Sequence, residues 1–132
     1  MKQYRFNPCR KWANKGHNAE NAACDYLGIP YKRDNVKFTD APDCGEWQVK
    51  GYNATVCMGL DLEAHMKQDA ATKWMYVDLN FKGWEMNASE WKEFIAVWGY
   101  ADKSSKGQDK LRIKKESRRM REWLEIKYMT QG

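Results

Sequence analysis

Residues 39–50 read TDAPDCGEWQVK, and this stretch decides how the rest of the chain is interpreted. The turn predicted at residues 42–43 leads directly into an alternating strand. Period-two geometry places Glu46, Gln48 and Lys50 on one face of that strand. Carboxylate and carbonyl oxygens are the ligands that Mg²⁺ prefers, and a bound Mg²⁺ activates water and neutralises phosphate charge. A lysine beside such ligands therefore indicates phosphodiester hydrolysis.

Helices and strands are predicted to mix along the whole chain. Apolar residues at helical spacing predict a helix over residues 14–27, ended by Gly28 and Pro30. Further elements follow from alternation, turn residues and apolar periodicity. We expect strands at 31–33, 36–39, 47–50 and 52–57, a helix at 60–73, a strand at 74–80 and its hairpin partner at 84–86. This mixture predicts an α/β fold.

The last third of the chain is predicted as helix, strand and helix. Asn87 and Glu90 have the spacing of a capping box and predict a helix over residues 88–98. The polar residues 101–109 predict a mobile basic loop. A strand over 110–114 and a helix over 116–128 close the sequence.

Pro42-Asp43 followed by Gln48-Val49-Lys50 resembles the PD-(D/E)xK nuclease signature, with Gln in the (D/E) position. The resemblance implies a restriction-endonuclease-like αβββαβ core. The predicted order of helix, short strands, helix and strand over residues 14–80 agrees with such a core.

The resemblance also implies the site. A Mg²⁺ or Mn²⁺ ion would be held by Glu20, Asp43, Gln48 and the main-chain carbonyl of Val49. Lys50 would act as the catalytic cation, together with Gln48, Asp43 and Glu20. Glu20 borders the buried stripe of the first predicted helix, so its carboxylate can turn towards the sheet. Asp40 is an alternative to Asp43, because the distance in sequence from Asp43 to Gln48 is short. Each acidic residue can also be an ordinary turn or helix residue.

The formal net charge of +5 is unevenly distributed. Residues 1–37 and 101–132 each carry +5, whereas residues 38–100 carry −5. An acidic middle between basic ends suits a cation site flanked by surfaces that attract polyanions. The residues predicted to contact a nucleic-acid backbone are Lys103, Lys106, Lys110, Arg112, Lys114, Arg118, Arg119 and Arg121.

The length of 132 residues and the 42% apolar content predict one domain, with a nuclease-like core at 14–80 and a helical extension with a basic loop and tail at 81–132. No apolar run approaches the roughly 18 residues needed to span a bilayer, and the N-terminus has no secretion signal. Cys9, Cys24, Cys44 and Cys57 lack the local pairing of zinc ligands, so we expect ordinary buried thiols in a reducing compartment.

Two functions are compatible with these observations. The first is a small Mg²⁺-dependent endonuclease that acts on DNA, of a type typical of phages or mobile elements. It would work in the cytoplasm of a bacterial host, without a membrane partner, and as a homodimer if two sites address two strands. The second is a non-catalytic module on the same fold that binds nucleic acid or protein, for instance to counter a host defence system.

Overall fold

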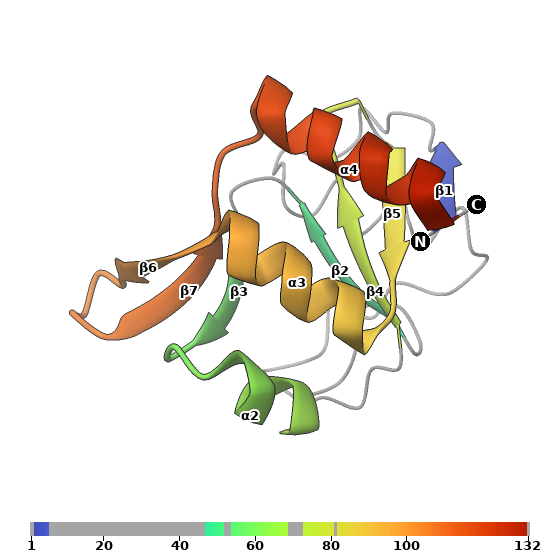
Figure 1. Ribbon diagram of the computed structural model, residues 1–132. Helices are drawn as coiled ribbons and strands as arrows, with labels where there is room; N and C mark the ends of the chain where they lie inside the picture. The colour runs from blue at the N-terminus through green and yellow to red at the C-terminus, as the bar shows by residue number, and fades with distance from the viewer. Residues whose placement is uncertain (1, 6–46, 52–53, 69–72, 81, 132) are drawn as a thin grey trace, which may run out of the picture.

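The structure is a computed structural model that describes residues 2–5, 47–51, 54–68, 73–80 and 82–131 (Figure 1). Within these residues the elements are β1 (Lys2–Arg5), β2 (Trp47–Gly51), β3 (Thr55–Met58), α2 (Leu62–Gln68), β4 (Lys73–Val77), β5 (Lys82–Met86), α3 (Ala88–Trp98), β6 (Gly99–Lys103), β7 (Asp109–Ile113) and α4 (Arg118–Gln131). The predicted mixed α/β class is therefore confirmed. The predicted helix at 14–27 and the strands at 31–33 and 36–39 lie outside the described residues.

The larger sheet has the strand order β1-β5-β4-β2. Strand β4 pairs in parallel with β2 and antiparallel with β5, which pairs antiparallel with β1. Because β4 is an interior strand, its side chains from Trp74 to Val77 are buried on both faces. Strand β1 was not predicted. Strand β5 begins at Lys82, two residues before the hairpin partner expected at 84–86, so Gly83 is part of the strand.

Helices α3 and α4 cross one face of this sheet (Figure 1). The sheet contributes Trp74, Tyr76 and Trp84 to a hydrophobic core, and α3 and α4 contribute Phe94 and Leu124. The rings of Tyr76 and Phe94 lie 5.1 Å apart in a tilted arrangement. Residues of the predicted extension (81–132) thus contribute to the same core as residues of the predicted nuclease-like segment (14–80).

The predicted capping box begins α3. The Asn87 side chain accepts a hydrogen bond from the Glu90 backbone N–H at 2.8 Å, and Glu90 Oε1 accepts one from the Asn87 N–H at 3.0 Å. These two bonds satisfy backbone donors that a helix otherwise leaves open. The predicted helix boundaries of 88 and 98 are confirmed.

The smaller sheet has the order β3-β7-β6, and its β6–β7 hairpin extends away from α3 (Figure 1). The prediction of a loop over residues 101–109 is wrong, because residues 101–103 belong to β6 and residue 109 begins β7. The turn between them contains Gly107 at a positive φ of 80°. The predicted helix, strand and helix are therefore a helix, a two-stranded hairpin and a helix.

Gly99 explains why β6 follows α3 without a loop. Its N–H donates to the carbonyl of Ile95, and a Cβ at this position would lie 2.4 Å from that carbonyl oxygen. Such an approach admits glycine only. Sequence patterns carry no signal of this close contact, because it depends on how the chain turns after the helix.

Three boundaries also differ from prediction. The strand expected at 52–57 is β3, which begins at Thr55 and belongs to the smaller sheet. The helix expected at 60–73 is α2, which spans Leu62–Gln68, with β4 beginning at Lys73. The last helix begins at Arg118 and continues to Gln131.

Candidate functional site

Strand β2 carries the part of the predicted site that the structure describes. Its alternating burial places Gln48 and Lys50, both half-buried, on one face and the fully buried Val49 on the other. In register with β4, Gln48 is opposite Trp74 and Lys50 is opposite Tyr76. Paired residues on adjacent strands project to the same face. Gln48 and Lys50 therefore lie at the margin of the aromatic core that α3 and α4 cover.

The side-chain carbonyl of Gln48 is the most unusual polar atom at this margin. Its Oε1 is buried and has no hydrogen-bond partner among the residues that the structure describes. A buried acceptor without a donor costs about 1–3 kcal/mol, so such atoms are rare in folded proteins. The atom is available to a ligand that can be bound by a carbonyl oxygen.

Lys50 lies near the Cys57 side chain of β3. Burial raises the pKa of the Cys57 thiol, the Lys50 charge opposes that rise, and the Asp61 charge adds to it. The thiol donates to the Gly59 carbonyl at 3.6 Å. No ion pair joins Lys50 to a carboxylate in the described part of the chain.

A β-bulge explains why Cys57 faces inwards. The register of β3 against β7 shifts between Thr55 and Cys57, so that Val56 and Cys57 are both buried, at 3% and 4% exposure. An inserted residue bends a strand and re-aims the side chains beside it. The prediction that Cys57 is an ordinary buried thiol is confirmed, although its proximity to Lys50 was not foreseen. The other three cysteines lie outside the described residues.

The acidic members of the predicted site, Glu20, Asp40 and Asp43, lie outside the described residues. Of the predicted site, the structure describes Gln48 and Lys50 on one face of β2 and Val49 between them on the other. Among the residues it describes, no three His, Cys, Asp or Glu side chains gather in a way that could hold a metal ion.

The predicted nucleic-acid-binding residues fall into two groups. Three of them are held in ion pairs: Lys103 with Asp109 at 2.5 Å, Arg112 with Asp102 at 3.1 Å and Arg118 with Glu122 at 3.2 Å. For the remaining five, the described residues include no ion-pair partner. These five are Lys106, Lys110, Lys114, Arg119 and Arg121. Arg121 nevertheless lies close enough to Glu116 to favour its ionised form.

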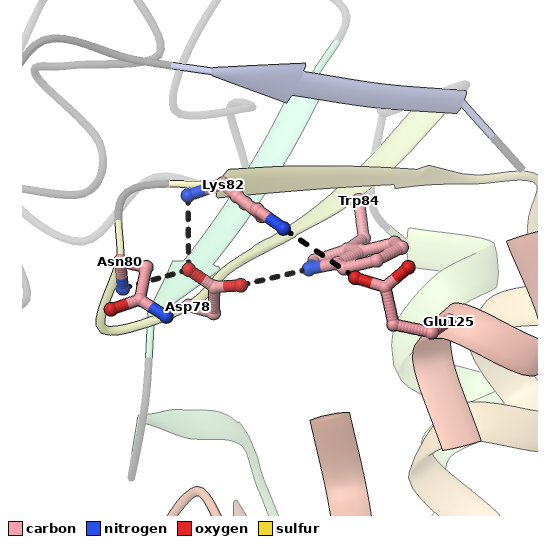
Figure 2. A network of polar contacts seen from close by, with 5 residues as sticks. All are labelled: Asp78, Asn80, Lys82, Trp84 and Glu125. Atoms are coloured by element: carbon pink, nitrogen blue, oxygen red, sulfur yellow. Dashed lines mark hydrogen bonds and ion pairs between the residues drawn. The ribbon is translucent and has the colours of Figure 1, made fainter. Parts of the chain in front are cut away.

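A buried carboxylate in the β4–β5 turn was not singled out from the sequence. Asp78 is 5% exposed, and its Oδ1 accepts from the backbone N–H groups of Asn80 and Lys82 at 2.8 and 2.9 Å (Figure 2). Its Oδ2 accepts from Trp84 Nε1 at 3.1 Å. Figure 2 also shows Lys82 Nζ directed to Glu125, at 3.5 Å. These bonds fix the turn and the core indole, so the role of Asp78 is structural.

A second carboxylate, that of Glu116, belongs to the segment that connects β7 to α4. Its Oε1 accepts from the Tyr76 hydroxyl at 3.4 Å and from the Leu79 N–H at 3.3 Å. Burial raises the pKa of Glu116, and the Asp78 charge adds to the rise, while the Leu79 N–H opposes it. Burial also raises the pKa of Tyr76, and the neighbouring carboxylates reinforce this.

Comparison with protein-family models, with curated proteins and with solved structures finds no match to this chain. Within the described residues, every helix is too short or too polar to cross a membrane.

Proposed function

We propose that this protein is a Mg²⁺- or Mn²⁺-dependent endonuclease that hydrolyses phosphodiester bonds in DNA at the Gln48–Lys50 face of β2. The observation that carries the proposal is the buried, unpartnered Oε1 of Gln48 on the same face as the Lys50 ammonium. A buried acceptor without a donor is costly in the free protein, and so is a half-buried lysine that has no carboxylate partner among the described residues. A bound cation and a phosphate group would compensate for both.

The residues present suit a hard divalent cation. A glutamine side-chain carbonyl is one of the oxygen ligands that Mg²⁺ accepts. Glu20, Asp43 or Asp40, and the Val49 main-chain carbonyl would complete the ligand set, as the resemblance to PD-(D/E)xK nucleases implies. When bound, the metal would supply an activated water and would neutralise phosphate charge.

Lys50 would stabilise the transition state. A half-buried ammonium interacts more strongly with developing negative charge than an exposed one, since water screens it less. Val49, fully buried on the opposite face, anchors the strand and so limits how far Lys50 can move.

The local topology supports this assignment. The chain leaves β2, passes through β3 and α2, and returns as β4 in parallel with β2. A parallel pair requires such a crossover. The order along the chain of strand, strand, helix and strand over residues 47–77 agrees with the later part of the core that the resemblance implies, although β3 belongs to the smaller sheet and not to the sheet of β2 and β4.

One observation favours a second candidate, a non-catalytic module that binds nucleic acid or a nucleic-acid enzyme, for instance to counter a host defence. Gln48 is a neutral ligand where the signature usually has a carboxylate. A neutral ligand binds Mg²⁺ more weakly, and a site that binds metal poorly catalyses poorly.

Replacing Gln48 with leucine tests the metal site. Gln48→Leu removes the unpartnered oxygen, so without metal its melting temperature should equal or exceed that of the wild type. In Mg²⁺ or Mn²⁺ the wild type should melt at a higher temperature by mass action, and the variant should gain much less. Equal metal-dependent gains in both proteins would contradict a role for Gln48 in metal binding.

A further inference from the structure

The outer face of the β6–β7 hairpin carries an excess of positive charge. Residues 99–114 contain five basic residues and two acidic ones. In β7, Leu111 packs against the core and Ile113 is fully buried within it. The alternate residues Lys110 and Arg112 therefore project from the opposite face of the sheet.

Strand pairing defines what surrounds these two cations. Arg112 is opposite Tyr100 on β6 and Thr55 on β3, whereas Lys110 is opposite Asp102 and Met58. The Asp102 carboxylate accepts from Arg112 Nη1. The Lys103 N–H lowers the pKa of Asp102 most, and the Arg112 hydrogen bond and the Lys110 charge contribute further. Asp102 thus stays ionised and balances one of the two cations on this face.

Lys103 is balanced in the same way by Asp109, across the first pair of the hairpin. Three basic residues of the hairpin form no ion pair with any residue that the structure describes, and we call them the hairpin cations: Lys106 in the turn, Lys110 in β7, and Lys114 immediately after it. Lys106 and Lys114 are exposed, and Lys110 is half-buried.

The spacing on β7 suits a nucleic-acid backbone. Alternate residues of an antiparallel strand lie about 6.8 Å apart. Along one DNA strand, alternate phosphates are separated by about the same distance in the axial direction. Lys110 on the outer face, with Lys106 before β7 and Lys114 after it, can therefore follow one phosphate backbone over several nucleotides.

We infer that the outer face of the β6–β7 hairpin binds the phosphate backbone of a nucleic acid through the hairpin cations, and that Lys103 and Arg118, although close to them in sequence, do not contribute. This inference rests on the proposed function only in taking a nucleic acid as the substrate. The inference separates basic residues that form ion pairs, such as Lys103 and Arg118, from those that form none within the described part of the chain. The sequence alone does not reveal these ion pairs.

The test is binding of a fluorescein-labelled duplex of mixed sequence, measured by anisotropy in EDTA over a range of NaCl concentrations. EDTA prevents hydrolysis, so the result does not depend on whether β2 is catalytic. The triple variant Lys106→Gln, Lys110→Gln, Lys114→Gln should reduce the slope of log affinity against log salt by about 2.7. Near 0.1 M salt its affinity should fall on the order of 10²-fold.

The matched control removes the same formal charge from exposed ion pairs. Lys92 pairs with Glu63 at 3.1 Å, so the control variant is Lys92→Gln, Lys103→Gln, Arg118→Gln. Its slope should change by less than about 1. Equal losses in the two triple variants would show that only net charge matters and would overturn the inference.

Two further outcomes would also overturn it. One is an unchanged slope in the hairpin variant, checked to be folded by its circular dichroism spectrum. The other is binding of the wild type to phosphatidylserine vesicles but not to the duplex, which would assign the hairpin to a membrane surface. Loss of duplex binding in the hairpin variant, from a wild type that does not cleave DNA, would support this inference while contradicting the proposed endonuclease.

Discussion

Replacing Asp78 with asparagine tests how the β4–β5 turn is held. The carboxylate is nearly buried and accepts hydrogen bonds from N–H groups only: two backbone groups at Oδ1 and the Trp84 indole at Oδ2. Asparagine has one acceptor oxygen, so its NH₂ group must face either the indole N–H or the two backbone N–H groups. The less costly choice leaves the indole donor, on a residue 1% exposed, without a partner.

The expected cost follows from that arrangement. A hydrogen bond to a charged acceptor is lost, and a buried donor remains unsatisfied, so the free energy of unfolding should fall by about 2–4 kcal/mol. Urea denaturation followed by tryptophan fluorescence measures this change, with an unaltered m-value as the sign that the unfolding transition is the same. Asp109→Asn is the control, because Asp109 is exposed and its ion pair with Lys103 should contribute less than about 1 kcal/mol.

A double-mutant cycle isolates the indole contact. Trp84→Phe removes the donor, so in that background the cost of Asp78→Asn should fall by about 1 kcal/mol or more. Additive effects of Asp78→Asn and Trp84→Phe would refute the reasoning, since they would show no coupling between the carboxylate and the indole.

Further measurements test other parts of the structure. Burial raises the pKa of Glu116, so folding favours its protonated form. The stability that this group contributes is lost as pH rises above about 4.5, so Glu116→Gln should gain stability relative to the wild type from acid to neutral pH. A difference in stability between the two proteins that does not change with pH would contradict this. Asn87→Ala should destabilise the protein by about 1 kcal/mol through loss of the cap, whereas Ser89→Ala, exposed in the same turn, should cost less than half as much. Asp43→Asn should abolish most of the rise in melting temperature with Mg²⁺, measured by scanning fluorimetry, and an unaffected rise together with a loss in Asp40→Asn would assign the ligand to Asp40.

Local patterns predicted the elements whose signals are local. The capping box at Asn87 and Glu90 and the apolar stripe after it define α3, because both depend on residues within a few positions of each other. The same holds for β2, where alternation correctly placed Gln48 and Lys50 on one face.

Elements that depend on distant partners were missed or misplaced. Residues 102 and 103 are charged, and they belong to a strand because they pair with residues 110 and 109 across the turn. Strand β1 exists by pairing with β5, and β3 faces β7 with a bulge that no local pattern indicates. Charged residues at the ends of such strands resemble loop residues until their partners are known.

The site was predictable only in part for the same reason. The pattern around Lys50 identified the strand and its polar face, but the burial of Gln48 Oε1 depends on the tertiary structure. The ion pairs that separate Lys103 and Arg118 from the hairpin cations likewise join residues by their spatial arrangement.

The most direct test of the proposed endonuclease is cleavage of supercoiled plasmid DNA in Mg²⁺ or Mn²⁺ by the wild type and by Lys50→Ala. The wild type should convert the plasmid to nicked or linear forms, and Lys50→Ala should do so about 10²-fold more slowly or worse, because the ammonium acts mainly in the transition state. Lys50→Arg should not restore the rate, since a planar guanidinium does not reproduce a compact point charge. A wild type that cuts neither plasmid nor nicked, branched or single-stranded DNA would contradict the proposed function, and equal cleavage by Lys50→Ala would contradict the assignment of the site.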